Sequence, residues 1–223
     1  MIIVSLKACV TKLFTGQPTP SIGESVGVVD KSLWLKEKDY MRKRMLEDLD
    51  IGYLDPDIYH VLLAIFMREE AFPISSCSGR ITIVDAPMPW HRKSSAVIFK
   101  KHTVVEEHEV LSVLRNSPPI NRLWLVATGP IFHISTLTLR EALSILRIAR
   151  EAGMKHSGIL SISRRGILVE LKTGVRVTIL LRSRDFVISD LQEAIRATNE
   201  ALLEGKSRLA KLYDLLLSSS RSQ

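Results

Sequence analysis

The chain has 223 residues, a formal net charge of +7 and a hydrophobic content of 46%. This length can bury a substantial core, and the absence of any run of about 18 apolar residues predicts a soluble globular protein and excludes one built on membrane-spanning helices. An excess of basic residues of this size favours a polyanionic partner such as nucleic acid. A surface charge that only keeps the protein in solution would explain the excess equally well.

The first 33 residues read as a loose extension, because residues 15–33 are rich in Gly, Pro, Ser and Thr. The apolar stretch at the start is interrupted by Lys7 and Lys12 and lacks a signal-peptide cleavage pattern, so we expect a cytoplasmic protein. Cys9 and Cys77 cannot form a disulfide framework, which agrees with a reducing compartment. The low content of Asn and Gln fits a heat-adapted protein.

Local signals along the rest of the chain predict alternating groups of helices and strands. Apolar residues repeat at every fourth position between 41 and 49, as in an amphipathic helix. Asp55 followed by Pro56 is typical of a helix start, and Thr138 with Glu141 forms a capping box. The predicted helices span about 35–49, 55–70, 106–115 and 138–153, with a last one from 189, and the predicted strands span 80–84, 96–102, 122–127, 129–135, 157–163, 167–172 and 174–181.

This order predicts an α+β protein with a mixed or largely antiparallel, curled sheet and flanking helices. Strictly alternating βα units are missing, which argues against a doubly wound, Rossmann-like fold. The stretches CSGRITIVD and HSGILSISR each follow a helix and lead into a further strand, which favours an internal duplication of a helix-strand-strand unit. We expect one domain over residues 34–217, after the extension 1–33 and before a disordered tail at 218–223.

The stretch SSCSGR, residues 75–80, concentrates small polar side chains beside one arginine. Hydroxyl groups and free backbone N–H groups in a turn bind carboxylates, phosphates or ribose hydroxyls, and Arg80 adds a planar fork that suits an anion. An ordinary polar turn between a helix and a strand, with Cys77 buried, is the simpler explanation of this stretch taken alone.

The sequence also offers candidates for a cysteine nucleophile, a metal site and a general base. Cys77 would need a neighbouring base to act as a nucleophile. Cys77, His91 and His102 lack the spacing of a metal site, so we expect no metal. His102 and His133 are candidate general bases, although a lone histidine on a strand is more often structural.

Basic residues recur in pairs on separate elements, including Lys100–Lys101 and Arg164–Arg165. If these pairs converged, they would attract a phosphate backbone, whereas as separate surface charges they indicate nothing special. The sequence has neither a Walker A loop nor a dinucleotide-binding glycine motif after a strand.

Several pieces of the sequence resemble the tRNA wybutosine-synthesizing protein 3 family. They are MREEAFPISSCSGRI (67–81), FKKH (99–102), GPIFHIS (129–135), and AGMKHSGI (152–159) with RRG (164–166). They occur in the family's order, and the resemblance covers about residues 34–216. Pro73 and Ile74 depart from it, because the family usually has two threonines there.

This resemblance implies a methyltransferase that depends on S-adenosylmethionine. Its substrate would be the tricyclic wyosine-type guanosine at position 37 of phenylalanine tRNA, methylated on ring nitrogen N4. Since the chain has no Gly-rich βα turn, the family would bind its donor on an unusual fold. No membrane and no protein partner are implied, and we expect a monomer.

Under this interpretation the candidate site residues fall into three groups. We expect donor binding by Ser75, Ser76, Ser78, Gly79, Arg80, Ser157 and Gly158, catalysis by His102 or His133, and RNA binding by Lys100, Lys101, Arg164 and Arg165. Ser76, Ser78 and Arg80 would hold a carboxylate of the donor or of the modified base. Two alternatives stay open: a non-catalytic basic RNA-binding protein of the same fold, and a thiol or metal enzyme built on Cys77, which we otherwise expect to serve in packing.

Overall fold

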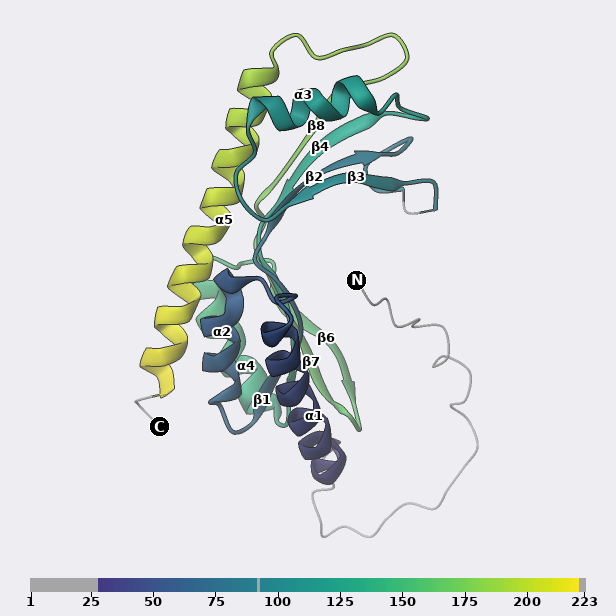
Figure 1. Cartoon of the computed structure of the whole chain (residues 1–223). Helices are drawn as coiled ribbons and strands as arrows, with labels where there is room; N and C mark the ends of the chain where they lie inside the picture. The colour runs from purple at the N-terminus through teal and green to yellow at the C-terminus, as the bar shows by residue number, and fades with distance from the viewer. Residues whose placement is uncertain (1–27, 92, 221–223) are drawn as a thin grey trace.

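The computed structural model describes residues 28–91 and 93–220. The predicted N-terminal extension falls mainly on residues 1–27, which lie outside the described residues, as do Cys9 and the last three residues of the predicted tail. In the described part, two sheets lie end to end and one long helix runs past both of them (Figure 1).

Eight strands in this part of the chain form two sheets: β1 (Ala71–Cys77), β2 (Arg80–Asp85), β3 (Ala96–Lys101), β4 (Leu123–Thr128), β5 (Ile131–Thr136), β6 (Gly158–Ser163), β7 (Gly166–Lys172) and β8 (Arg176–Arg182). Sheet A has the order β1-β5-β7-β6 and sheet B the order β3-β2-β4-β8. Every neighbouring pair is antiparallel, which confirms the predicted α+β class and differs from a Rossmann-like fold. Instead of the single curled sheet expected, the strands form two separate sheets. Three connections pass from one sheet to the other, between β1 and β2, β4 and β5, and β7 and β8.

The helices of the described part are α1 (Lys31–Asp50), α2 (Pro56–Phe66), α3 (Glu107–Asn116), α4 (Leu139–Glu151) and α5 (Leu191–Ser220). Asp55 and Thr138 cap α2 and α4 as predicted, each accepting a hydrogen bond from a backbone N–H of the first turn. α1 begins earlier than predicted because Asp30 caps it in the same way. α5 extends to Ser220, into the region of the expected tail. None of the helices described is long and apolar enough to cross a membrane.

The structure corrects one element: residues 71–77, expected as part of a helix-to-strand turn, form strand β1. Pro73 cannot donate to a strand ladder and serine clusters are typical of turns, so the local sequence hides the strand. It forms because β5 pairs with it, with an irregularity in register between Pro73 and Ser75. The two Ser-Gly pairs of the expected duplication also occupy different positions, since Ser78–Gly79 joins β1 to β2 whereas Ser157–Gly158 leads into β6.

The two sheets meet in a narrow region that we call the waist. It consists of residues 78–79 between β1 and β2, 129–130 between β4 and β5, and 173–175 between β7 and β8. Gly129 donates its N–H to the carbonyl of Val175 at 3.0 Å. Gly79 has a φ of 97°, and a Cβ there would lie 2.8 Å from the carbonyl oxygen of Thr128. The crossing from β1 to β2 therefore requires a glycine.

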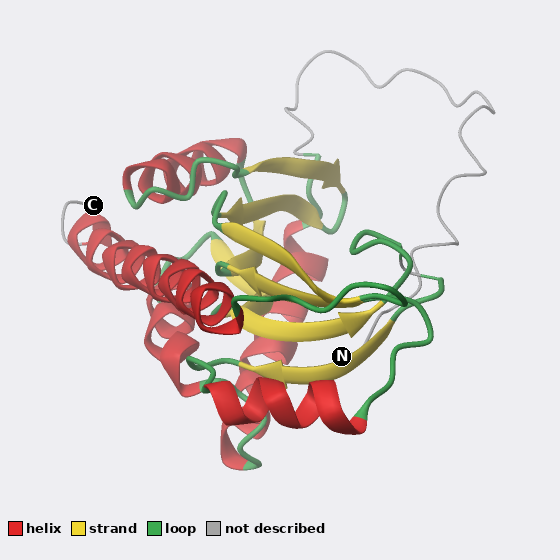
Figure 2. Cartoon of the chain, turned by 90° about the horizontal axis from the view of Figure 1, so that it is seen from above, coloured by secondary structure: helices red, strands yellow, loops and turns green. Residues whose placement is uncertain are grey.

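Each sheet buries one face in its own hydrophobic core, and α5 belongs to both cores (Figures 1 and 2). The core of sheet A includes Leu209 and Leu216 of this helix together with α2 and α4. The core of sheet B includes Leu202 together with residues of α3. Between them Gly205 faces the waist, and a Cβ there would lie 3.0 Å from the Cα of Gly129. α5 thus holds the two cores together by direct contact with the crossing strands.

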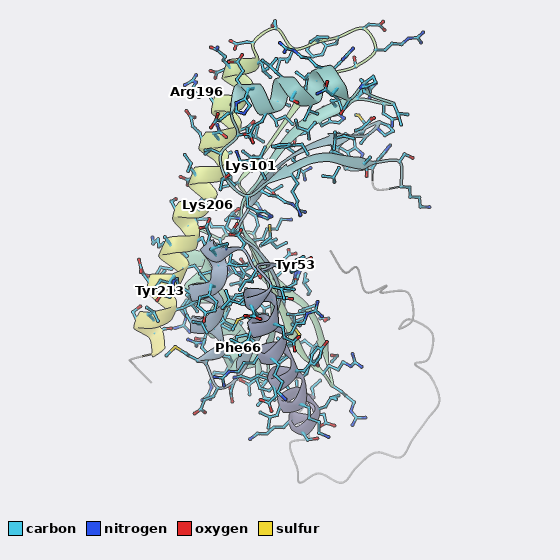
Figure 3. All side chains as sticks on the ribbon, in the orientation of Figure 1. Tyr53, Phe66, Lys101, Arg196, Lys206 and Tyr213 are labelled. Atoms are coloured by element: carbon cyan, nitrogen blue, oxygen red, sulfur yellow. The ribbon has the colours of Figure 1, made fainter. Side chains whose placement is uncertain are left out.

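α5 is also tied to the start of α2. Lys206 forms an ion pair with Asp57 in the first turn of α2. Figure 3 shows Lys206 midway along α5, between Arg196 beside sheet B and Tyr213 beside sheet A. The contact fixes the beginning of α2 relative to the waist.

Replacing Gly205 by valine tests the close packing at the waist. Gly205→Val should lower the free energy of unfolding by about 1–3 kcal/mol, because the larger side chain must push α5 away from Gly129. Chemical denaturation measures the change. The matched control is Ala210→Val on the exposed side of the same helix, which should cost less than about 0.7 kcal/mol. Equal losses in the two variants would contradict the packing described.

A buried ion pair joins three helices around the core of sheet A. Arg68, which follows α2, contacts Glu141 of α4 through two nitrogens, with Nη2 3.1 Å from Oε2. Its Nη1 donates to the hydroxyl of Ser219 in α5 at 2.9 Å. The two charged side chains are only 3% and 9% exposed. Each charge therefore depends on the other to offset its desolvation.

Removing one partner of this pair should be costly. Arg68→Ala should lower the free energy of unfolding by about 3–5 kcal/mol, because Glu141 is left buried without its counter-charge. Chemical denaturation again provides the measurement. The double variant Arg68→Met with Glu141→Leu is the control and should lose much less stability. A single variant that is as stable as this double variant would show that the buried charge carries no penalty.

Candidate active site

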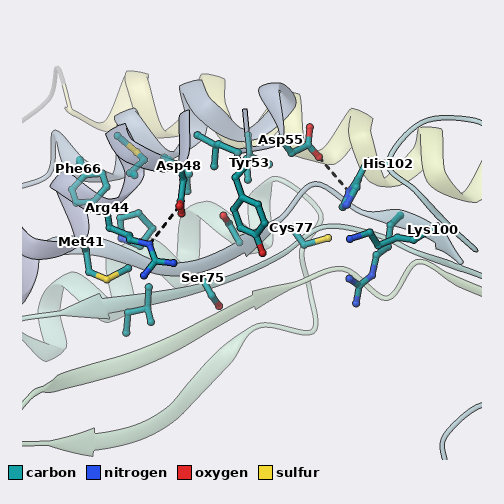
Figure 4. A pocket seen from close by; sticks show the side chains of 18 residues that line it. Met41, Arg44, Asp48, Tyr53, Asp55, Phe66, Ser75, Cys77, Lys100 and His102 are labelled. Atoms are coloured by element: carbon teal, nitrogen blue, oxygen red, sulfur yellow. Dashed lines mark hydrogen bonds and ion pairs between the residues drawn. The ribbon is translucent and has the colours of Figure 1, made fainter. Parts of the chain in front are cut away.

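A cavity of about 420 Å³ runs along the edge strand β1, between α1 and α2, and reaches the waist (Figure 4). Apolar side chains form much of its wall: Met41, Met45, Leu54, Ile58, Leu62, Phe66, Pro73 and Ile74. Charged groups stand at both ends, with Arg44 and Asp48 on α1 and with Asp55, Arg80, Lys100 and His102 at the waist. Ser75, Ser76 and Cys77 lie on β1 between them.

Asp55 organises the waist end of this cavity. Its Oδ1 accepts a hydrogen bond from the backbone N–H of Asp57 at 3.1 Å, which caps α2. Its Oδ2 accepts the hydroxyl proton of Ser78 and lies 3.3 Å from Nδ1 of His102. Ser78 is fully buried, so its hydroxyl supports Asp55 and does not line the cavity.

His102 presents one ring nitrogen as an acceptor. Its Nδ1 lies 2.8 Å from the carbonyl oxygen of Gly79. Because a carbonyl oxygen can only accept a hydrogen bond, this geometry assigns the proton to Nδ1. In the neutral ring Nε2 is then the acceptor, at the waist end of the cavity. His102 also ties the end of β3 to the crossing between β1 and β2.

A second histidine belongs to a row of three polar side chains on sheet A. Ser75, His133 and Glu170 are directly opposite one another on β1, β5 and β7. The Ser75 hydroxyl is 2.7 Å from His133 Nδ1, and His133 Nε2 is 3.3 Å from a carboxylate oxygen of Glu170. The nearby Glu170 carboxylate favours the tautomer with its proton on Nε2, in which Nδ1 of the neutral ring can accept the Ser75 proton. A hydroxyl in the cavity is therefore linked to an imidazole and, through it, to a carboxylate.

Arg80 and Lys100 connect the cavity to the open face of sheet B. α3 and α5 cover the other face of this sheet (Figure 1). The register places Arg80 and Arg176 on either side of Thr128, so both arginines share one face. Because side chains alternate along a strand, Trp124 lies on this face as well. The open face thus combines cations with an aromatic ring, and it begins at the mouth of the cavity.

Three of the predicted RNA-binding residues lie elsewhere. Lys101 is on the core side of sheet B and donates to both carboxylate oxygens of Glu109, at 2.8 and 2.9 Å. This contact, with help from the backbone N–H of Glu106, lowers the pKa of Glu109. Arg164 and Arg165 occupy the turn between β6 and β7, at the end of sheet A away from the waist. Of these predicted cations, Lys100 is the one that the structure brings to the cavity.

Two further predicted donor-binding residues lie outside the cavity wall. Ser157 is buried and donates to the carbonyl of Met154 at 2.6 Å, while its oxygen accepts the N–H of Lys172 at 3.0 Å. It therefore fixes the entry into β6. Gly158 lies opposite Glu170 and extends the row from Ser75, with open space where a side chain would stand.

Cys77 lines the cavity as a partly exposed free thiol. Within residues 28–91 and 93–220, no three His, Cys, Asp or Glu side chains gather as a metal site would require. His91 lies in the turn between β2 and β3. The wall position gives Cys77 contact with whatever fills the cavity, in addition to the packing role expected for it.

Several residues of the site could not be identified as site residues from the sequence. Asp55 was recognised only as a helix cap, and Glu170 only as part of a strand. Arg44, Asp48 and the exposed Tyr53 of the cavity wall carry no recognisable motif. The helical spacing of Arg44 and Asp48 was the one available signal, because residues four apart share a helix face.

The sequence matches the family described as Methyltransferase TYW3 over residues 34–218. The chain belongs to this family. A relative from Saccharolobus solfataricus, named tRNA(Phe) 7-((3-amino-3-carboxypropyl)-4-demethylwyosine(37)-N(4))-methyltransferase, is 44% identical over 85% of this chain and 92% of that protein. A relative of the same name from Aeropyrum pernix is 36% identical over 73% of this chain and 87% of its own length. The predicted family is confirmed, and a methyltransferase is favoured over a non-catalytic RNA-binding protein.

Solved structures show the same fold. A protein from Pyrococcus horikoshii superposes with a TM-score of 0.78 at 26% identity, covering 84% of this chain and 97% of that one. A protein from Aeropyrum pernix gives a TM-score of 0.66 at 30% identity, covering 74% and 98%. The relatives come mostly from archaea and include heat-loving species.

Proposed function

We propose that this TYW3-family protein transfers a methyl group from S-adenosylmethionine to ring nitrogen N4 of the wyosine-type guanosine at position 37 of phenylalanine tRNA. Family membership and the names of the relatives support this substrate. The observation that carries the proposal is the meeting of two features at one cavity. The row Ser75–His133–Glu170 reaches it from sheet A, and the basic open face of sheet B begins at its mouth.

The cavity suits such a donor in size and chemistry. Its volume of about 420 Å³ falls in the range of small-molecule sites, and a largely apolar wall with a few polar groups is typical of them. β1 is an edge strand, so the backbone groups on its outer side can bond a ribose or a purine ring. Ser76 and Cys77 add polar atoms on this strand. S-adenosylmethionine supplies a methyl group on a positively charged sulfur.

The open face of sheet B is where we place the RNA. Arg80, Lys100 and Arg176 would contact phosphates, which positions the strand without reading its sequence. Trp124 offers a ring on which a base can stack. A base that undergoes chemistry must leave its stack and enter the site. Tyr53, 62% exposed on the cavity wall, is placed to stack against it.

The row on sheet A would remove the proton from N4. As the bond between N4 and the methyl carbon forms and the bond from that carbon to sulfur breaks, Ser75 takes the N4 proton and passes its own to Nδ1 of His133. Glu170 then stabilises the imidazolium through Nε2. His102, with Nε2 as an acceptor, would orient the base from the waist end. Catalysis otherwise consists of positioning the two reactants.

Substitutions in this row should slow the chemical step and leave donor binding unchanged. Ser75→Ala and His133→Ala should each lower the single-turnover rate constant by about 10²–10⁴, the usual contribution of general base catalysis. Glu170→Gln should lower it by at least about tenfold, because the imidazolium loses its counter-charge. The measurement is transfer of labelled methyl from S-adenosylmethionine to phenylalanine tRNA from a strain that lacks the enzyme.

Ser161→Ala is the matched control, because Ser161 is an exposed serine on β6 of the same sheet and outside the row. It should keep the wild-type rate. If Ser75→Ala and His133→Ala also kept it, the proton relay would be wrong although the methyl transfer would stand. A wild-type protein that neither bound the donor nor modified the tRNA would instead refute the function itself.

The thiol of Cys77 should be dispensable for the reaction. Cys77→Ala should transfer methyl groups at close to the wild-type rate, since the proposed chemistry uses no thiolate. Alkylating the wild-type protein with a bulky maleimide should block transfer by filling the cavity, and bound donor should slow the alkylation. The alkylated Cys77→Ala protein is the control and should remain active. Loss of activity in unmodified Cys77→Ala would favour a thiol mechanism.

Acting on tRNA, the protein would work in the cytoplasm. We expect it to act as a monomer.

A further inference from the structure

The end of the cavity away from the waist carries a charged pair that the relay and the RNA face do not use. Arg44 and Asp48 lie one turn apart on α1, and both line the cavity. Nε of Arg44 is 3.4 Å from Oδ1 of Asp48. Figure 4 shows the pair beside Met41 and Phe66, at the opposite end from Lys100. Both side chains are partly buried, with 37% and 24% of their surface exposed.

The helix that carries this pair is firmly attached to sheet A. Trp34 of α1 is fully buried, and its ring lies 5.0 Å from the ring of Phe72. Its indole N–H donates to the hydroxyl of Ser135 at 3.0 Å. The pair is therefore presented to the cavity at a fixed place, which is what a binding group needs in order to act without a large cost in ordering.

Opposite charges side by side suit a ligand that also carries both charges. A guanidinium has five N–H donors. In Arg44, Asp48 occupies the one on Nε and Tyr40 also forms a side-chain hydrogen bond with the guanidinium, so the remaining N–H groups of the terminal nitrogens can hold a carboxylate. The carboxylate of Asp48 can accept from an ammonium group. At the waist end the carboxylate of Asp55 is already engaged by Asp57, Ser78 and His102. Arg80 and Lys100 are therefore left there for an anionic ligand such as phosphate.

We propose that Arg44 and Asp48 clamp an α-amino-acid group, with Arg44 on its carboxylate and Asp48 on its ammonium. This rests on the proposed function, which brings such a group to the cavity from two sources. One is the methionine part of S-adenosylmethionine. The other is the 3-amino-3-carboxypropyl side chain that the names of the relatives give to their substrate. In both cases a short methylene chain would pass the apolar wall at Met41 and Ile74.

Binding and turnover measurements on Arg44→Gln and Asp48→Asn test the clamp and separate its two sources. If the donor occupies it, the affinity for S-adenosylmethionine falls by at least about tenfold, as expected for a lost charge-assisted hydrogen bond. Binding of 5′-methylthioadenosine, which lacks the amino-acid group, stays unchanged. If the tRNA side chain occupies it, donor affinity is unchanged, and kcat/KM falls by at least about tenfold for tRNA that carries the side chain and not for tRNA that lacks it.

The charge-swapped double variant Arg44→Asp with Asp48→Arg is the control for a purely structural role. It keeps an ion pair on α1 and should melt close to the wild-type temperature, while it shows the same binding or turnover defect as the single variants. The proposed clamp would be wrong if the single variants matched the wild type in both donor binding and turnover. It would also be wrong if the charge-swapped variant showed normal binding and normal turnover. The wild-type protein in the same assays distinguishes that outcome from a failure of the proposed function.

Discussion

The architecture depends on one close approach, that of α5 to the waist at Gly205. The backbone of Gly129 lies directly beneath this helix position, and even a Cβ at Gly205 would lie only 3.0 Å from its Cα. Because α5 contributes to the cores of both sheets, this contact couples two units that share only short connections. The contact places α5 directly against the waist, where the edge of sheet A with its cavity meets the open face of sheet B.

The site explains how a donor with a nucleoside could be held without a glycine-rich loop at the start of a helix. In doubly wound folds, the phosphate or ribose is held at the end of a parallel strand. In the proposed function, the edge of β1 and the walls of α1 and α2 would provide the binding surface instead. The same strand carries Ser75 into the row with His133, so donor binding and proton removal would occur on neighbouring residues.

Much of the local structure could be predicted from the sequence. Caps such as Asp55 and Thr138 act within one turn, and alternation in RITIV is a local property of β2. β1 could not be predicted, because it becomes a strand only through pairing with β5 some sixty residues later in the chain. The same limit applies to the site. His133 was a candidate general base from its residue type, but its contact with Glu170 depends on the register between β5 and β7.

The family resemblance supplied what spacing alone could not. From SSCSGR alone an ordinary turn was the simpler explanation, and the structure shows how one stretch serves two purposes. Ser78 and Gly79 build the crossing at the waist, whereas Ser75, Ser76, Cys77 and Arg80 line the cavity. The basic residues divide in the same way, since adjacent positions on a strand face opposite sides. Lys100 therefore reaches the open face while Lys101 pairs with Glu109.

The most direct test of the central claim is a crystal structure of the protein with S-adenosylhomocysteine, the product of the donor. We expect the ligand along β1 between α1 and α2, with its sulfur on the side of Ser75 and the waist left open toward sheet B. A ligand bound at another surface, with the cavity along β1 empty, would contradict the assignment of this cavity as the site of methyl transfer.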